Sequence, residues 1–73
     1  MSLTLPEAIQ QKVAAMRETS YGVNRVTLVL KDGRRVFDAD IAWANEIARI
    51  GGRAVKEESQ LGFSLREIVD VTQ

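Results

Sequence analysis

The sequence predicts a mainly β fold, either a small barrel or a curled antiparallel sheet with one N-terminal α-helix, in a single domain of residues 1–73. Three observations support this prediction: apolar residues at helical spacing near the N-terminus, two alternating segments that flank an Asp-Gly pair, and a β-branched segment at the end of the chain. An α+β alternative of helix, hairpin, helix and strand stays open, because residues 40–50 fit two patterns.

A helix is expected over about residues 5–19. One apolar stripe runs along it, made of Leu5, Ile9, Val13 and Met16. Thr4 and Glu7 have the spacing of a capping box, and Pro6 falls in the first turn, where its missing N–H costs nothing. Gly22 can adopt the left-handed conformation that ends many helices.

A hairpin is expected over about residues 23–43. Asp32-Gly33 is typical of a two-residue type I′ turn, and such a turn fixes the register of the two strands. The predicted cross-strand pairs are Leu28 with Phe37, Val26 with Ala39, Val29 with Val36, and Arg25 with Asp40. The same alternation places Phe37 and Trp43 on the core face and leaves Tyr21 exposed.

Residues 40–50 are ambiguous between helix and strand. On a helical wheel the apolar residues share one half, with Asp40 and Gly51 as candidate caps. As a strand, the period-2 pattern runs unbroken from Phe37 to Trp43, and Asn45 suits a turn. We favour strand–turn–strand because it continues the preceding pattern.

The C-terminal third predicts short elements. Residues 53–56 suit a short strand after the Gly51-Gly52 turn, and residues 57–60 suit an exposed loop. Ser64 and Glu67 form a second capping box pattern, with Phe63 and Ile68 placed as a hydrophobic staple. The β-branched residues that follow indicate a closing strand over about residues 67–72.

This order of elements resembles that of Sm/Lsm-like and SH3-like small barrels. The stretch Val26-Thr27-Leu28-Val29-Leu30-Lys31-Asp32-Gly33-Arg34 resembles the opening of the Sm motif, and Leu65-Arg66-Glu67-Ile68-Val69-Asp70-Val71 resembles its second part. In that family six or seven subunits form a ring joined strand to strand, and U-rich or A-rich RNA threads the pore. The resemblance implies RNA contacts by Asn45 and Arg66, to which the neighbouring Arg34 and Arg35 are added as candidate phosphate contacts.

The chain departs from the Sm pattern in three ways. Glu67 replaces the glycine of the Arg-Gly pair, and Asp38 stands where a second glycine lets the strand bend. Asp40 and Glu46 also add negative charge near the loop that would contact RNA.

Composition argues against an enzyme. The chain has no His and no Cys, so the usual zinc ligands, the commonest general base and any thiol chemistry are missing. Asp38 and Asp40 share one strand face in the predicted register, but we interpret them as solvent-facing residues, not as an acid/base pair. No cofactor, metal or small-molecule substrate is expected.

The predicted function is a small non-enzymatic binding or assembly module. A core this small often needs a partner, and ten basic against ten acidic residues do little to oppose association, so a homo-oligomer is expected. No apolar run suits a membrane span and no secretory signal is visible, so a cytoplasmic location is expected. The alternatives are an Sm-like RNA-binding ring and an accessory subunit of a larger complex such as a phage particle.

Overall fold

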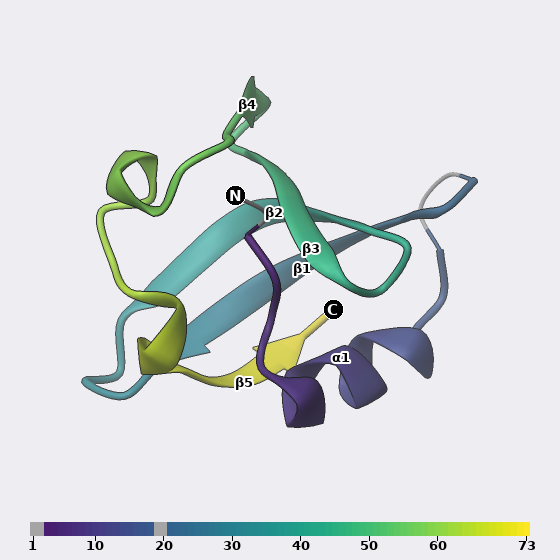
Figure 1. Ribbon diagram of the computed structural model, residues 1–73. Helices are drawn as coiled ribbons and strands as arrows, with labels where there is room; N and C mark the ends of the chain where they lie inside the picture. Colours follow the sequence, from purple (N-terminus) through teal and green to yellow (C-terminus); the bar gives the residue numbers. More distant parts are fainter. Residues whose placement is uncertain (1–2, 19–20) are drawn as a thin grey trace.

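The computed structural model describes residues 3–18 and 21–73 and shows five antiparallel strands in one open, curled sheet with an N-terminal helix (Figure 1). The sheet order is β4-β3-β2-β1-β5. The elements are α1 (Glu7–Ala14), β1 (Val23–Leu30), β2 (Arg35–Ala42), β3 (Glu46–Ile50), β4 (Arg53–Ala54), β5 (Ile68–Thr72) and the 3₁₀ turns η1 (Glu58–Gln60) and η2 (Leu65–Glu67). The mainly β prediction is confirmed. The alternative of a second helix is wrong, because residues 40–50 contain the end of β2, a turn and β3.

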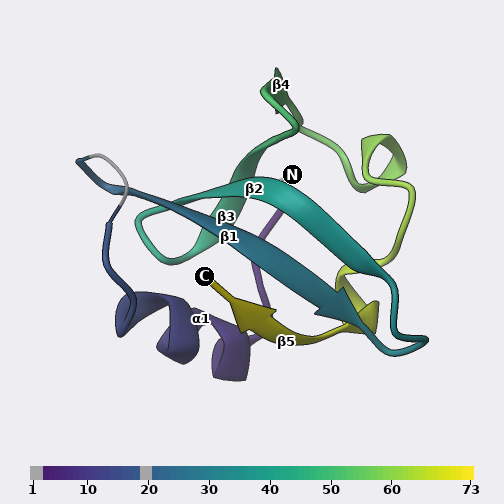
Figure 2. The same ribbon diagram turned by 180° about the vertical axis from the view of Figure 1, so that it is seen from behind.

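The core lies between the concave face of the sheet and α1. Its buried apolar residues are Leu3, Leu5, Ile9, Val13, Val26, Leu28, Leu30, Ala39, Ile41, Ile47, Ile68 and Val71. Three residues of the predicted helical stripe are among them, and Met16 packs against the cluster while partly buried. α1 packs alongside β5, as both views of the ribbon show (Figures 1 and 2).

The helix is shorter than the predicted 5–19, and its predicted capping box is wrong. Pro6 is the N-cap residue, and no side chain caps the first turn. Residues 3–5 instead pair alongside β3. Thr4 forms an antiparallel β-bridge with Glu46, and the backbone N–H of Leu5 donates to the Asn45 carbonyl at 2.9 Å. Thr4, which the predicted capping box requires, is thus part of this β pairing.

The end of the helix also differs from the prediction. Residues 15–18 are not helical, and residue 19 lies outside the described residues. The buried Asn24 side chain donates to the carbonyls of Met16 and Arg17, so a strand residue replaces helical hydrogen bonds there. Gly22 does have a positive φ, 72°, but it lies in the turn before β1 and does not cap α1.

The turn between β1 and β2 has three residues, not the predicted two. The Leu30 N–H donates to the Arg34 carbonyl at 2.8 Å, and the Gly33 N–H donates to the Leu30 carbonyl at 2.9 Å. Within the described residues Gly33 has a positive φ, 91°, and Asp32 does not. A three-residue loop that ends in a left-handed glycine is the next commonest hairpin after the two-residue types.

The extra loop residue shifts the register near the turn by one. Leu28 therefore faces Val36 instead of Phe37, and Val29 faces Arg35 instead of Val36. An irregularity between Val26 and Leu28 restores the predicted register, so the pairs of Val26 with Ala39 and Arg25 with Asp40 are confirmed.

The irregularity is a β-bulge that turns Phe37 out of the core. Phe37 and Asp38 together oppose one residue of β1, and Asp38 has a φ of 57°. Phe37 is 63% exposed, so its predicted place in the core is wrong. A one-residue change of register moves a side chain to the other face of a sheet, and here the side chain that moves is that of Phe37.

The C-terminal elements follow the prediction closely. β4 is the expected short strand, and β5 is the expected closing strand. The Ser64 hydroxyl accepts the N–H of Arg66, so Ser64 caps η2 as predicted. The predicted capping box with Glu67 is wrong, because the carboxylate of Glu67 pairs with Arg34. The exposed loop over 57–60 contains one 3₁₀ turn, in which Glu57 and Gln60 form a capping box.

Candidate functional site

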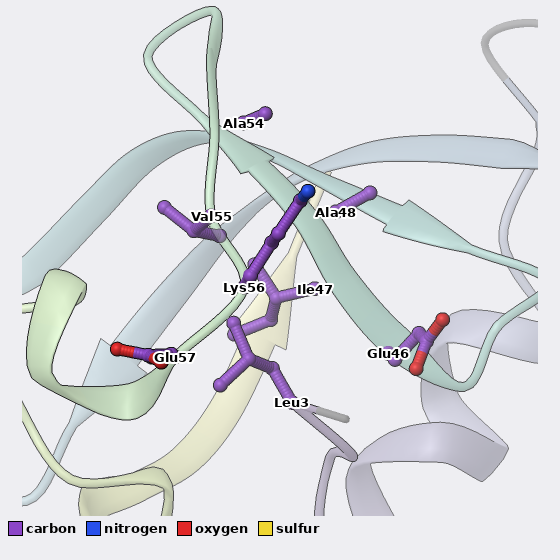
Figure 3. Close-up of a pocket in the computed structure, with 8 residues that line it drawn as sticks. All are labelled: Leu3, Glu46, Ile47, Ala48, Ala54, Val55, Lys56 and Glu57. Atoms are coloured by element: carbon purple, nitrogen blue, oxygen red, sulfur yellow. The ribbon is translucent and has the colours of Figure 1, made fainter. Parts of the chain in front are cut away.

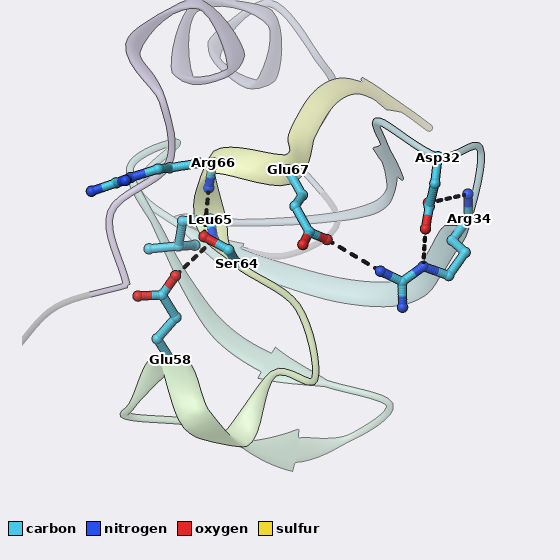
Figure 4. A network of polar contacts seen from close by, with 7 residues as sticks. All are labelled: Asp32, Arg34, Glu58, Ser64, Leu65, Arg66 and Glu67. Atoms are coloured by element: carbon cyan, nitrogen blue, oxygen red, sulfur yellow. Dashed lines mark hydrogen bonds and ion pairs between the residues drawn. The ribbon is translucent and has the colours of Figure 1, made fainter.

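The predicted RNA-contact arginines lie near the β1–β2 turn and η2. Arg34 is held by two carboxylates, at 2.7 Å from Asp32 Oδ2 and 3.2 Å from Glu67 Oε2. Figure 4 shows Arg66 on the other side of η2, pointing in a different direction from Arg34. Arg35 begins β2 and is exposed.

Asn45 lies at the opposite end of the sheet. It follows the far end of β2, and eight residues of strand separate the two ends by about 25 Å at 3.3 Å per residue. Both ribbon views show the β1–β2 and β2–β3 turns at opposite ends of the molecule (Figures 1 and 2). The structure thus brings the three arginines to one end and does not bring Asn45 to them.

The β2–β3 turn displays a tryptophan in a strained backbone conformation. Trp43 and Ala44 have φ of 55° and 57°, and the Asn45 N–H donates to the Ala42 carbonyl at 3.0 Å. Two positive φ angles at the centre of a turn normally select Asn-Gly or Gly-Gly, because a Cβ costs about 1–2 kcal/mol per residue there. Trp43 is nevertheless 67% exposed, so its predicted place in the core is wrong.

Gly22 and Tyr21 hold the indole in place. A Cβ on Gly22 would lie 2.8 Å from the indole Cη2, so the ring rests directly on the glycine backbone. The backbone N–H of Trp43 donates to the Gly22 carbonyl at 2.7 Å. Tyr21 is 89% exposed, as predicted, and meets the indole at 90° with ring centroids 5.5 Å apart. We call Tyr21, Gly22, Trp43 and Ala44 the aromatic turn.

Two cavities flank the aromatic turn on the side of α1. They have volumes of about 340 and 430 Å³ and share Ala14, Trp43 and Ala44. The remaining lining residues are Glu7, Gln10 and Gln11 in the first, and Val13, Met16, Glu18 and Asn24 in the second. We call the two together the acidic groove, since Glu7 and Glu18 are the charged residues that line them.

A third cavity, of about 690 Å³, lies beside the outer edge of β3 (Figure 3). Leu3, Ile47 and Val55 gather at its base, and Lys56 and Glu57 lie at its rim. The backbone of this edge is already paired, because the Ile47 N–H donates to Leu3 and the Val55 N–H donates to Ala48. The cavity has apolar walls but no convergent set of polar groups that would orient a ligand.

The bulge in β2 separates the two aspartates that were predicted to share one face. Asp40 accepts a hydrogen bond from Arg25 Nε at 2.9 Å, and its side chain is only 7% exposed, so its predicted solvent-facing position is wrong. This hydrogen bond, reinforced by the charge of Asp40, raises the pKa of Arg25. Asp38 is exposed. Among residues 3–18 and 21–73 no group of three or more acidic residues could hold a metal ion.

Comparison with known protein families, curated proteins and solved structures gives no match. Within the described residues no helix has the length and apolar character needed to span a membrane. The aromatic turn is the feature that sequence reasoning missed. Trp43 continues an alternating apolar pattern, and only the conformation of the turn shows that the pattern ends before it.

Proposed function

We propose that this chain is a non-enzymatic, cytoplasmic assembly module that forms homo-oligomers through the aromatic turn. The observation that carries the proposal is the exposed Trp43 in a left-handed conformation. Strained residues of this kind persist where the surrounding structure holds them, and they gather at binding sites. Tyr and Trp are also the residues that contribute most to binding in protein interfaces. The turn uses conformational energy to present an indole to solvent, which suits a contact surface.

The two strand edges suit association less well. β4 has two residues, both exposed, and one of them is the charged Arg53. Short and charged edge strands discourage strand-to-strand pairing. This edge offers a second copy little to pair with.

The β5 edge is blocked by a side chain. The backbone N–H and carbonyl of Leu30 are directed toward β2, and those of Leu28, two residues earlier, point the same way. Val71 lies opposite Leu28, so its N–H points away from β1. That N–H donates to the Asp70 carboxylate at 2.8 Å. The carboxylate in turn accepts Lys12 Nζ of α1 at 2.6 Å. An incoming strand would have to displace this ion pair.

Sedimentation equilibrium tests the proposal. The wild-type chain should show a mass above 8.1 kDa that rises with concentration, and Tyr21→Ala and Trp43→Ala should shift the mass toward the monomer. Phe37→Ala is the matched control, because Phe37 is similarly exposed but does not line the acidic groove. A wild-type monomer at every concentration up to about 1 mM would reject the proposal, because the free energy of association would then be weaker than about 4 kcal/mol.

An Sm-like RNA-binding ring is the second candidate. The position of Arg34, Arg35 and Arg66 at one end of the sheet favours it, because exposed arginines can contact phosphates. Titration with labelled poly-U and poly-A at two salt concentrations tests it. Saturable, salt-sensitive binding together with a mass of six or seven subunits would favour the ring over the aromatic-turn assembly.

A further inference from the structure

The acidic groove and the β1–β2 turn, at opposite ends of the sheet, differ in their charged residues. The acidic groove has Glu7 and Glu18 in its walls, and no Lys or Arg lines it among the residues that the structure describes. The opposite end carries the β1–β2 turn, with exposed Lys31, Arg34 and Arg35. We call these three residues the basic turn.

The cations of the basic turn differ in how they are held. Arg34 forms ion pairs with Asp32 and Glu67, so its guanidinium is fixed and part of its charge is offset. Lys31 and Arg35 flank this network, and their side chains are exposed. They are therefore the two cations of the turn best placed to meet a carboxylate of another molecule.

We propose that the basic turn of one copy docks in the acidic groove of the next, beside Trp43. This inference rests on the proposed function and names the surface that the aromatic turn contacts. A cation placed over the indole face would gain a cation–π interaction, and Glu7 and Glu18 would supply the opposite charge. Trp43 also separates the two cavities, so side chains of the incoming turn can enter on both sides of it.

Docking of this kind is head to tail, because the two surfaces lie at opposite ends of the sheet (Figures 1 and 2). A head-to-tail dimer then keeps one unused groove on one copy and one unused turn on the other. A heterologous contact closes into a ring if the rotation between copies permits it, and otherwise continues as a filament. The contacting charges are exposed, so assembly should weaken as salt rises above about 0.1 M.

Complementary variants test the proposal. Lys31→Glu/Arg35→Glu reverses two charges of the basic turn, and Glu7→Gln/Glu18→Gln removes the charge of the groove. Gln at position 18 keeps an oxygen acceptor for the Gly22 N–H, which Glu18 accepts at 3.1 Å. Each variant alone should self-associate at least about tenfold more weakly in sedimentation equilibrium. Arg53→Glu/Lys56→Glu changes net charge as much as the first variant does, at a distant site, and should assemble like the wild type.

Mixing the two variants is the decisive step. An equimolar mixture gives one possible head-to-tail contact that joins Trp43 of the basic-turn variant to Lys31 and Arg35 of the groove variant. The mixture should therefore form dimers and stop there. If Lys31→Glu/Arg35→Glu assembles like the wild type while Trp43→Ala does not, the head-to-tail contact is wrong although assembly through the aromatic turn stands. If the wild type is a monomer, both are wrong.

Discussion

Replacing Ala44 by glycine should stabilise the protein. Ala44 has a φ of 57°, a conformation that costs an L-residue about 1–2 kcal/mol and costs glycine nothing. Glycine also raises the conformational entropy of the unfolded chain, which offsets about 0.4–1 kcal/mol of that gain. The expected net gain is therefore about 0–1.6 kcal/mol. In a domain of this size a gain of 1 kcal/mol raises the melting temperature by about 4–8 °C.

Thermal unfolding followed by circular dichroism measures the effect. Ala8→Gly is the matched control, because Ala8 is exposed within α1 and the same substitution there should cost about 1 kcal/mol. The two variants should thus shift the melting temperature in opposite directions. An Ala44→Gly variant that melts below the wild type would show that the turn is not strained, and the main argument for a contact surface at Trp43 would be lost.

Four other substitutions test the fold. Phe37→Ala should cost less than about 1 kcal/mol because the ring is exposed, whereas Leu28→Ala should cost about 2–5 kcal/mol; equal losses in urea unfolding would contradict the bulge. Gly22→Ala should displace the indole, so an unchanged Trp43 emission spectrum would contradict the close contact. The hydrogen bond from Lys12 lowers the pKa of Asp70 below its ordinary 3.8, so its contribution is present above that pH and is lost below it. Lys12→Met should reduce this acid dependence, and identical acid titrations would argue against the pair.

The strands were predictable because their patterns are local. Val26, Leu28 and Leu30 are buried and alternate with less buried positions, and the pattern by itself indicates which face is buried. The Ser64 cap and the closing strand also follow from residue types a few positions apart. These features need no knowledge of distant contacts.

The loop length and the bulge were not predictable in the same way. Asp-Gly suits both two- and three-residue hairpins, and the choice here brings the Asp32 carboxylate to the Arg34 N–H and Arg34 itself to Glu67 of η2. The first contact is local, but the second depends on tertiary structure. The bulge at Asp38 then compensates for the added loop residue. The error in the predicted loop length therefore gave a wrong position for Phe37, while the predicted position of Ala39 is correct.

The helix boundaries failed for a related reason. Thr4 and Glu7 match a capping box, yet pairing of residues 3–5 with β3 satisfies the backbone groups of Leu3 and Leu5 and buries both side chains. Burial of two leucines contributes several times the roughly 1 kcal/mol that a helix cap is worth. Tertiary packing therefore overrides the local capping pattern.

The cost of the aromatic turn is large compared with the stability that so small a domain can have. A chain of 73 residues has a free energy of unfolding of about 4–11 kcal/mol at 0.05–0.15 kcal/mol per residue, and two left-handed non-glycine residues cost about 2–4 kcal/mol of it. Asn-Gly at positions 43 and 44 would avoid that cost and close the same turn. Trp43 recovers little of it through burial, since most of its side chain faces solvent. The indole is therefore better explained by a contact made with another molecule than by the stability of the isolated fold.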